Sequence, residues 1–440
     1  MFIFMETRMK TLFGILLVLC SMAAYYFIGY QIERSDLYLL LFSVGLSFGC
    51  YFYLLKQPIS IGAILISGLL FRLVFALSTP SLSQDFYRFI WDGALFLRGI
   101  SPYTYVPEEL IYLESYRDLR PLYEGMGAAS ARNFSNYPML NQWLFALGSL
   151  SEHPPFVYRL LIVLADLAVF WLLHQLILSF THKRWALTAY FLNPLVIVEG
   201  THNLHFEPVM LAFLLAFIYA LKRKRQGLAA VFFSASVFTK LLPLLIGPLL
   251  LRWLKPKSLT LFSLSFLALS VLFIVPFSGP LWAQNWGASV GLWFSNFEFN
   301  GALYRVFKEV GLLLGAQDYQ LIKVYGYLHG FSIVLLSGYF SMRSTNLNQF
   351  LRYSEWLLLA YLLSSPTIHP WYLITLVGLA SLRKSHLVLL WSATVFLSYS
   401  AYAQSPVELP LWVTAAEYLP LVALAYFANR SSSRSSLLSR

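Results

Sequence analysis

The chain has 440 residues, of which 58% are hydrophobic and only 12% are charged, and its formal net charge is +11. Soluble domains carry about 25% charged residues, so this composition excludes a soluble globular protein and indicates a polytopic membrane protein. The positive charge does not indicate nucleic-acid binding, because the Lys and Arg residues lie in short clusters between apolar segments, which is typical of positive-inside topology.

Apolar segments recur along the whole chain, and those near 20 residues are long enough to cross the ~30 Å hydrocarbon core as helices. We predict one all-α transmembrane domain over residues 1–429 and a short cytoplasmic tail over residues 430–440. The expected number of membrane-spanning helices is about 11 to 14. The candidate spans are 11–30, 37–55, 58–78, 156–178, 186–199, 207–221, 227–240, 242–254, 259–277, 324–341, 351–364, 371–382, 387–402 and 409–427.

If the first helix starts in the cytoplasm, alternation of the spans puts the basic clusters, such as 222–225, on the cytoplasmic side. The long segment 79–155 and the loop 279–322 then lie on the outer face. Residues 79–155 are too apolar and aromatic for a free loop, so we expect interfacial helices there. One of these is predicted over 86–98, where Phe86, Phe89 and other apolar residues follow helical spacing.

Charged side chains gather just after the third apolar segment. Asp85 and Asp92 are two helical turns apart, and Arg88 is close enough to Asp85 to pair with it. Asp92 is expected to brace Arg88 or Arg98. The plain alternative is a solvated ion pair at the start of a helix.

A second polar stretch, residues 193–210, is predicted to lie at the outer surface. It contains Glu199, His202, His205 and Glu207 within nine residues. Imidazole and carboxylate groups suit zinc or manganese, so a metal site is one interpretation. The alternative is an interfacial turn whose polar side chains face water.

Two further signals lie later in the chain. Lys240 stands in an otherwise apolar stretch, where it needs a cavity, a counter-charge or a route to the interface, and a phosphate-bearing lipid would suit it. His369, Trp371 and Tyr372 lie in a turn with two prolines, where His369 adds a group that titrates near neutral pH. Trp371 and Tyr372 could alternatively form only an aromatic belt.

Two loops are rich in rings and amides, namely 132–143 and 293–307, and the second also contains Glu298 and Arg305. Such residues suit carbohydrate, which binds by stacking on rings and by hydrogen bonds to amides. Either loop could equally be a plain interfacial loop.

Taken together, four motifs resemble the GT-C superfamily of polytopic glycosyltransferases. They are the stretch Asp-Phe-Tyr-Arg-Phe-x-Trp-Asp-Gly from Asp85 with the Gly-x-x-Pro-Tyr that ends at Tyr103, His-Phe-Glu at 205–207, Thr-Lys-x-x-Pro at 239–243, and His-Pro-Trp-Tyr at 369–372. The nearest resemblance is to the polyprenol-phosphate-mannose-dependent mannosyltransferases, including the GPI mannosyltransferase I group and its bacterial relatives.

The resemblance implies a function and a set of roles. Such enzymes move a hexose, here mannose, from a polyprenyl-phosphate carrier to a lipid or glycan acceptor on the outer side of the membrane. An acidic residue in the first outer loop acts as the general base, and Asp85 matches it. The expected substrate-binding residues are Arg88, Asp92, Tyr103, His205, Glu207, Lys240, His369, Trp371 and Tyr372.

The resemblance also bears on cofactors, partners and location. Some relatives have Asp-x-Asp in this loop, whereas this chain has Ser83-Gln84-Asp85. We therefore expect no required cofactor, with a divalent metal as the alternative. The expected partners are the lipid-linked donor, the acceptor and membrane lipids, with no nucleic acid. The predicted location is the plasma or inner membrane, with the active site on the non-cytoplasmic side.

Two other functions compete with this prediction. A transporter or flippase of lipid-linked sugars would place its ionisable groups deep in the membrane, whereas most of these groups are predicted at one surface. An O-antigen-type polymerase or ligase would also act on lipid-linked sugars outside the membrane. The Asp-containing first loop argues against it.

Overall fold

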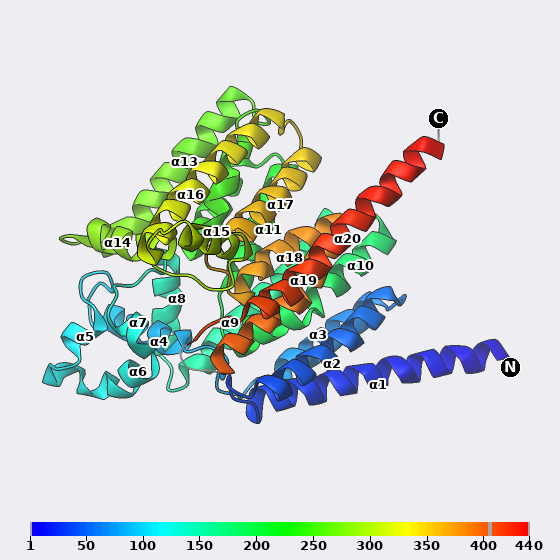
Figure 1. Ribbon diagram of the computed structural model, residues 1–440, viewed down its shortest axis with the longest axis horizontal. Helices are drawn as coiled ribbons and strands as arrows, with labels where there is room; N and C mark the ends of the chain where they lie inside the picture. Colours follow the sequence, from blue (N-terminus) through cyan, green and yellow to red (C-terminus); the bar gives the residue numbers. More distant parts are fainter. Residues whose placement is uncertain (1, 404–406, 439–440) are drawn as a thin grey trace.

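The computed structural model describes residues 2–403 and 407–438 and is almost entirely helical over them (Figure 1). In this part of the chain the only β-type pairing is a pair of isolated bridges from Phe299 and Asn300 to Thr367. The elements in chain order are α1 (Phe2–Tyr30), α2 (Leu37–Lys56), α3 (Ile61–Val74), α4 (Asp85–Leu97), α5 (Pro107–Leu110), η1 (Glu114–Leu119), α6 (Arg120–Gly125), α7 (Gly127–Ala131), α8 (Met139–Ser149), α9 (Pro154–Leu176), α10 (Phe180–Phe191), η2 (Val196–His202), α11 (Glu207–Lys222), α12 (Gln226–Thr239), η3 (Leu242–Leu250), α13 (Pro256–Ile274), η4 (Val275–Phe277), α14 (Trp282–Ser295), α15 (Ala302–Leu313), α16 (Asp318–Arg343), α17 (Leu347–Ser364), η5 (Pro370–Tyr372), α18 (Leu373–Arg383), α19 (His386–Thr394), η6 (Val395–Ala403) and α20 (Leu411–Leu438).

The predicted fold class, an all-α polytopic membrane protein, is confirmed. Among the described residues, six helices are long and apolar enough to cross a membrane, or seven if η2 and α11, which bend by 111°, form one span. The predicted 11 to 14 spans exceed this number because they included elements that do not meet this test. Three of them are the shorter apolar helices Ile61–Val74, Gln226–Thr239 and Leu411–Phe427, and others correspond to α10, η3, α17 and α18.

The last helix extends into the segment that we predicted as a separate short tail, residues 430–440. Helix α20 runs from Leu411 to Leu438 and therefore continues through most of the predicted tail. The remaining residues of the predicted tail, 439–440, lie outside the described residues.

The segment 79–155 is helical, as its apolar spacing predicts. Helix α4 begins at Asp85 and is followed by the short elements from α5 to α7 and then by α8, and this group lies together at one end of the molecule (Figure 1). Helices α4 and α8 pack closely, because the ring of Phe89 stacks on that of Phe145 with centroids 4.5 Å apart. The position of Asp85, at the first turn of α4, is therefore set by this helix pair.

A single added methyl group at the α4–α8 contact is expected to destabilise the protein. A Cβ atom on Gly93 would lie 2.4 Å from the Phe145 carbonyl oxygen, so the helices would have to separate. We expect Gly93→Ala to lower stability by about 1–3 kcal/mol, the usual cost of overpacking. The measurement is thermal unfolding in detergent, with Gly45→Ala in α2 as the control, because a Cβ on Gly45 meets nothing within 4 Å. An equal melting temperature for the two variants would contradict the close approach.

Asp166 lies in the middle of the apolar helix α9, is fully buried, and is paired with Arg72 and Tyr190. It accepts a hydrogen bond from Arg72 Nε at 2.8 Å and another from the Tyr190 hydroxyl at 2.7 Å. Because a lone charge in the membrane interior is very costly, this pairing explains how an apolar helix carries a carboxylate. It joins α3, α9 and α10 and lies apart from the groups described below.

The loop expected over 279–322 is also helical, forming α14 and α15. The Ser289 hydroxyl of α14 donates to the Phe134 carbonyl at 2.9 Å, and the Asn285 side chain donates to the Tyr103 carbonyl at 2.9 Å. Apolar residues at helical spacing in 282–295 and 302–313 could have indicated these helices. Helix α14 thereby holds the segment 79–155 against the second half of the chain.

Candidate functional site

A cavity of about 200 Å³ lies where six separate stretches of the chain meet, and we call it the Asp85 cavity. It brings together five of the residues singled out from the sequence. The residues used below that line it are Asp85, Tyr137, Glu207, Lys240, Trp371 and Tyr372. Because these residues are up to 287 positions apart in sequence, their convergence comes from the fold and not from local spacing.

Asp85 is the first residue of α4, and its side chain is 34% exposed. Partial burial raises the pKa of this carboxyl above its usual value, while the positive charge of Lys240 and a hydrogen bond from Tyr137 oppose the rise. The carboxylate oxygen also lies 4.0 Å from Nδ1 of His205. Asp85 therefore combines access to the cavity with a proton affinity above that of a fully solvated aspartate.

Lys240 provides the positive charge of the cavity. Helix α12 ends at Thr239, the backbone of Lys240 is extended, and η3 starts two residues later, so the side chain leaves the helix at its end. Lys240 Nζ donates to Glu207 Oε1, whereas the buried Glu207 Oε2 has no hydrogen-bond partner. The ammonium group thus lies in the cavity with one counter-charge and spare donors.

Rings form one wall of the cavity and continue behind it. His205 stacks on Trp371 with centroids 3.7 Å apart, and His369 stacks on the same indole at 4.4 Å. His205 and His369 do not line the cavity itself. Burial, helped by the charge of Lys240, lowers the pKa of His369 to about 3. The prediction that His369 titrates near neutral pH is therefore wrong, because its ring is stacked between Phe299 and Trp371, where a positive charge would lose hydration.

The predicted water-facing stretch 193–210 is buried. Glu199 and His202 are both 0% exposed, so the expectation of an outer-surface turn is wrong. Glu199 accepts hydrogen bonds from Asn203 at 2.9 Å and from Tyr399 at 2.7 Å. The stretch forms a π-helical turn, and such turns occur frequently at functional sites.

A residue of this buried stretch, Glu199, lies next to the His205 imidazole. Glu199 Oε2 lies 3.8 Å from His205 Nε2, on the opposite side of the imidazole from Asp85. The other candidate ligand, His202, instead contacts Ser78 and Ser81. Within residues 2–403 and 407–438, no group of three or more His, Cys, Asp or Glu side chains is arranged to hold a metal ion.

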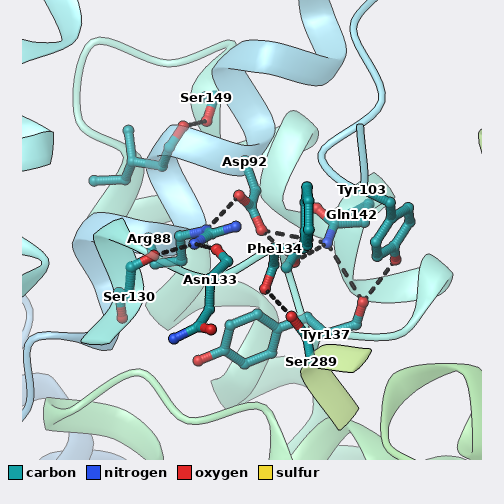
Figure 2. A network of polar contacts seen from close by, with 12 residues as sticks. Arg88, Asp92, Tyr103, Ser130, Asn133, Phe134, Tyr137, Gln142, Ser149 and Ser289 are labelled. Atoms are coloured by element: carbon teal, nitrogen blue, oxygen red, sulfur yellow. Dashed lines mark hydrogen bonds and ion pairs between the residues drawn. The ribbon is translucent and has the colours of Figure 1, made fainter. Parts of the chain in front are cut away.

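Arg88, Asp92 and Tyr103 lie beside the cavity and not in it (Figure 2). Arg88 Nε donates to Asp92 at 2.6 Å, so the predicted pairing of Arg88 with Asp85 is replaced by the pairing one turn further along α4. Arg88 also donates to the carbonyls of Ser130 and Asn133, and Asp92 accepts from Ser135. These contacts fasten the segment 130–137 to α4.

The residue that this network positions is Tyr137, which the sequence patterns did not single out. The Tyr103 hydroxyl donates to the Tyr137 carbonyl at 2.6 Å (Figure 2). The Phe89 ring meets the Tyr137 ring edge-on at 5.0 Å. Tyr137 lines the Asp85 cavity. The only sequence signal for it was its place in the ring-rich loop 132–143.

About half of the chain matches a known protein family. Residues 37–255 match the family model described as alpha-(1->6)-mannopyranosyltransferase, N-terminal domain, which is a GT-C type mannosyltransferase family. The matched range contains Asp85, Glu207 and Lys240, whereas Trp371 and Tyr372 lie beyond it. No curated protein and no solved structure gave a significant match.

Proposed function

We propose that this GT-C type mannosyltransferase takes mannose from a polyprenyl-phosphate carrier and transfers it to a hydroxyl of a lipid or glycan acceptor at the outer face of the membrane. The observation that carries the proposal is that Asp85 and Lys240 line the same cavity. Glycosyl transfer from a lipid phosphate needs two groups: a base for the acceptor hydroxyl and a cation for the leaving phosphate.

Asp85 is the general base in this proposal. The acceptor hydroxyl loses its proton as its oxygen attacks the anomeric carbon, and a carboxylate within hydrogen-bond reach can take that proton. Asp85 is the more accessible of the two carboxylates that line the cavity, because Glu207 is 1% exposed and already bound to Lys240. Tyr137 and His205 hold Asp85 from two sides.

Lys240 stabilises the leaving lipid phosphate. The bond between the anomeric carbon and the phosphate oxygen breaks, and the negative charge that collects on phosphate is best stabilised by preorganised donors. The Lys240 ammonium group retains donors beyond the one directed to Glu207. Tyr372 and the edge of the Trp371 indole supply aromatic surface for the sugar between the two groups, because the two stacked histidine rings cover the faces of that indole.

The direct test is to incubate the purified protein with polyprenyl-phosphate mannose and an acceptor, and to measure free polyprenyl phosphate together with the mannosylated product. We expect both to form in equal amounts. A transporter or flippase would move the donor without releasing lipid phosphate. A polymerase or ligase would consume lipid-linked oligosaccharide and leave polyprenyl-phosphate mannose intact, and either result would overturn the proposal.

The rate of transfer is expected to fall in acid at a higher pH than for a solvent-exposed aspartate base. Burial raises the pKa of Asp85, and the base works only when it is ionised, so activity is present above that pKa and lost below it. The measurement is kcat/KM against pH. Because the charge of Lys240 lowers the pKa of Asp85, Lys240→Met should move the acidic limb to higher pH. A limb that stays in place would argue against Asp85 as the titrating group.

A further inference from the structure

A second pocket, of about 250 Å³, shares no lining residue with the Asp85 cavity, and we call it the Asn300 pocket. Helix α15 and the segment that precedes it provide most of its polar lining. The residues that matter here are Glu298, Asn300, Tyr304, Arg305, Lys308 and Glu309. It lies in the ring- and amide-rich loop singled out from the sequence, to which the proposed chemistry assigns no role.

A short backbone pairing separates the two cavities. The Phe299 N–H donates to the Pro366 carbonyl at 3.0 Å, and the Ile368 N–H donates to the Phe299 carbonyl at 2.7 Å. Thr367 lines the Asp85 cavity, whereas Pro366 and Phe299 line the Asn300 pocket. The two cavities therefore lie on opposite sides of one thin wall.

Stacked rings join the two sides of this wall. The Phe299 ring stacks on His369 with centroids 4.7 Å apart, and His369 stacks on Trp371 at 4.4 Å. Phe299 lines the Asn300 pocket and Trp371 lines the Asp85 cavity. The Asn300 pocket and the Asp85 cavity are thus separated by two successive ring contacts. A ligand that reaches both would have to be longer than one sugar unit.

The charges of the Asn300 pocket are already balanced within the protein. Lys308 Nζ lies 2.6 Å from Glu298 and 2.8 Å from Asp318, and Arg305 Nε lies 2.8 Å from Glu309. A phosphate would have to compete with these carboxylates for the cations. The pocket therefore suits a neutral ligand better than a phosphorylated one.

One buried polar atom in the pocket points to a hydrogen-bonding ligand. Asn300 is 5% exposed, and its Nδ2 donates to Glu417 at 3.1 Å, but its Oδ1 has no hydrogen-bond partner. A buried acceptor without a donor costs free energy that a ligand hydroxyl would recover. The Arg305 guanidinium and the Glu309 carboxylate offer further donors and acceptors to hydroxyls.

We propose that the Asn300 pocket binds neutral sugar residues of the acceptor glycan, remote from the hydroxyl that is glycosylated at the Asp85 cavity. This inference rests on the proposed function, because it takes the reaction in the Asp85 cavity to be glycosyl transfer. Binding at a remote site orients the acceptor and raises its affinity without taking part in the reaction.

The first test is equilibrium binding without donor, by calorimetry, with α-1,6-linked mannobiose and inorganic phosphate as the two probes. We expect the wild type to bind mannobiose saturably and phosphate at least tenfold more weakly. Arg305→Gln should weaken mannobiose binding about tenfold, since it removes the charged hydrogen-bond donors offered to the sugar hydroxyls. Tyr304→Phe, which keeps the ring and removes the hydroxyl, should weaken binding by a smaller factor.

The matched control is Arg117→Gln. Arg117 also pairs with a glutamate on a short helix, at 3.1 Å from Glu114, but lies outside the pocket. It should leave mannobiose affinity unchanged. Preference for phosphate, absence of mannobiose binding, or equal affinity in Arg305→Gln and the wild type would each overturn the inference.

A kinetic test separates this inference from the proposed function. Arg305→Gln should raise KM for the acceptor about tenfold while leaving release of lipid phosphate to water, in the absence of acceptor, unchanged. If the wild type releases no lipid phosphate under any condition, the proposed function fails, and the binding experiment still judges the pocket. If the variant loses release to water and acceptor use together, the pocket is not a separate acceptor site.

Discussion

Asp85→Asn is expected to reduce mannosyl transfer by 10²- to 10⁴-fold, the usual contribution of a general base. The amide keeps the shape of the side chain and its hydrogen bonding to Tyr137, but it cannot accept the proton of the acceptor hydroxyl. Expression and donor binding should stay close to wild type, because Asp85 lies at the start of α4 with its side chain only partly buried. The measurement is the initial rate of product formation in a membrane assay, with donor binding followed separately.

The matched control is Asp118→Asn. Asp118 also pairs with a cation, Arg98, in the same outer segment, but it is 61% exposed and outside the Asp85 cavity. Its rate should stay within a factor of two of wild type, because exposed ion pairs contribute about 0–1 kcal/mol. If Asp85→Asn kept a tenth or more of the wild-type rate, the assignment of Asp85 as base would be wrong.

Composition and hydropathy predicted the fold class because both depend on residue type averaged over long segments. The helix at 86–98 was predictable for a related reason, since its apolar spacing and its end near Gly99 are local properties. The number of spans was not, because an apolar run such as 61–74 has the composition of a span without its length. A hydropathy average shows how apolar a segment is but does not show how many of its residues form one continuous helix.

The candidate site was predictable in its members but not in its geometry. Asp85, Glu207 and Lys240 were singled out because charges are costly in an apolar chain, whichever way they point. Only the fold could show that Arg88 pairs with Asp92 outside the cavity, or that His369 stacks on Phe299 and Trp371. Tyr137 escaped because a tyrosine in an aromatic-rich protein carries no distinguishing signal.

Lys240→Met is the second change with a large expected effect. Loss of the ammonium group removes the cation proposed to hold the leaving phosphate and leaves the Glu207 carboxylate buried without its partner. Loss of one preorganised donor typically costs 10²–10³ in rate, and the residual carboxylate would also repel the phosphate. We therefore expect a loss of at least 10³-fold in kcat/KM for the donor, with lowered thermal stability from the unpaired charge.

The double variant Lys240→Met/Glu207→Gln separates these two effects. Removing the orphaned carboxylate should restore most of the lost stability, because replacing both members of a buried pair is far less costly than removing one. It should restore only the part of the activity that was lost through repulsion, leaving transfer at least 10²-fold below wild type. Lys222→Met is the control, since Lys222 Nζ donates only to backbone carbonyls, such as that of Leu176 at 3.1 Å. If the double variant recovered wild-type rates, Lys240 would serve only to neutralise Glu207, and the phosphate-binding role would pass to another group.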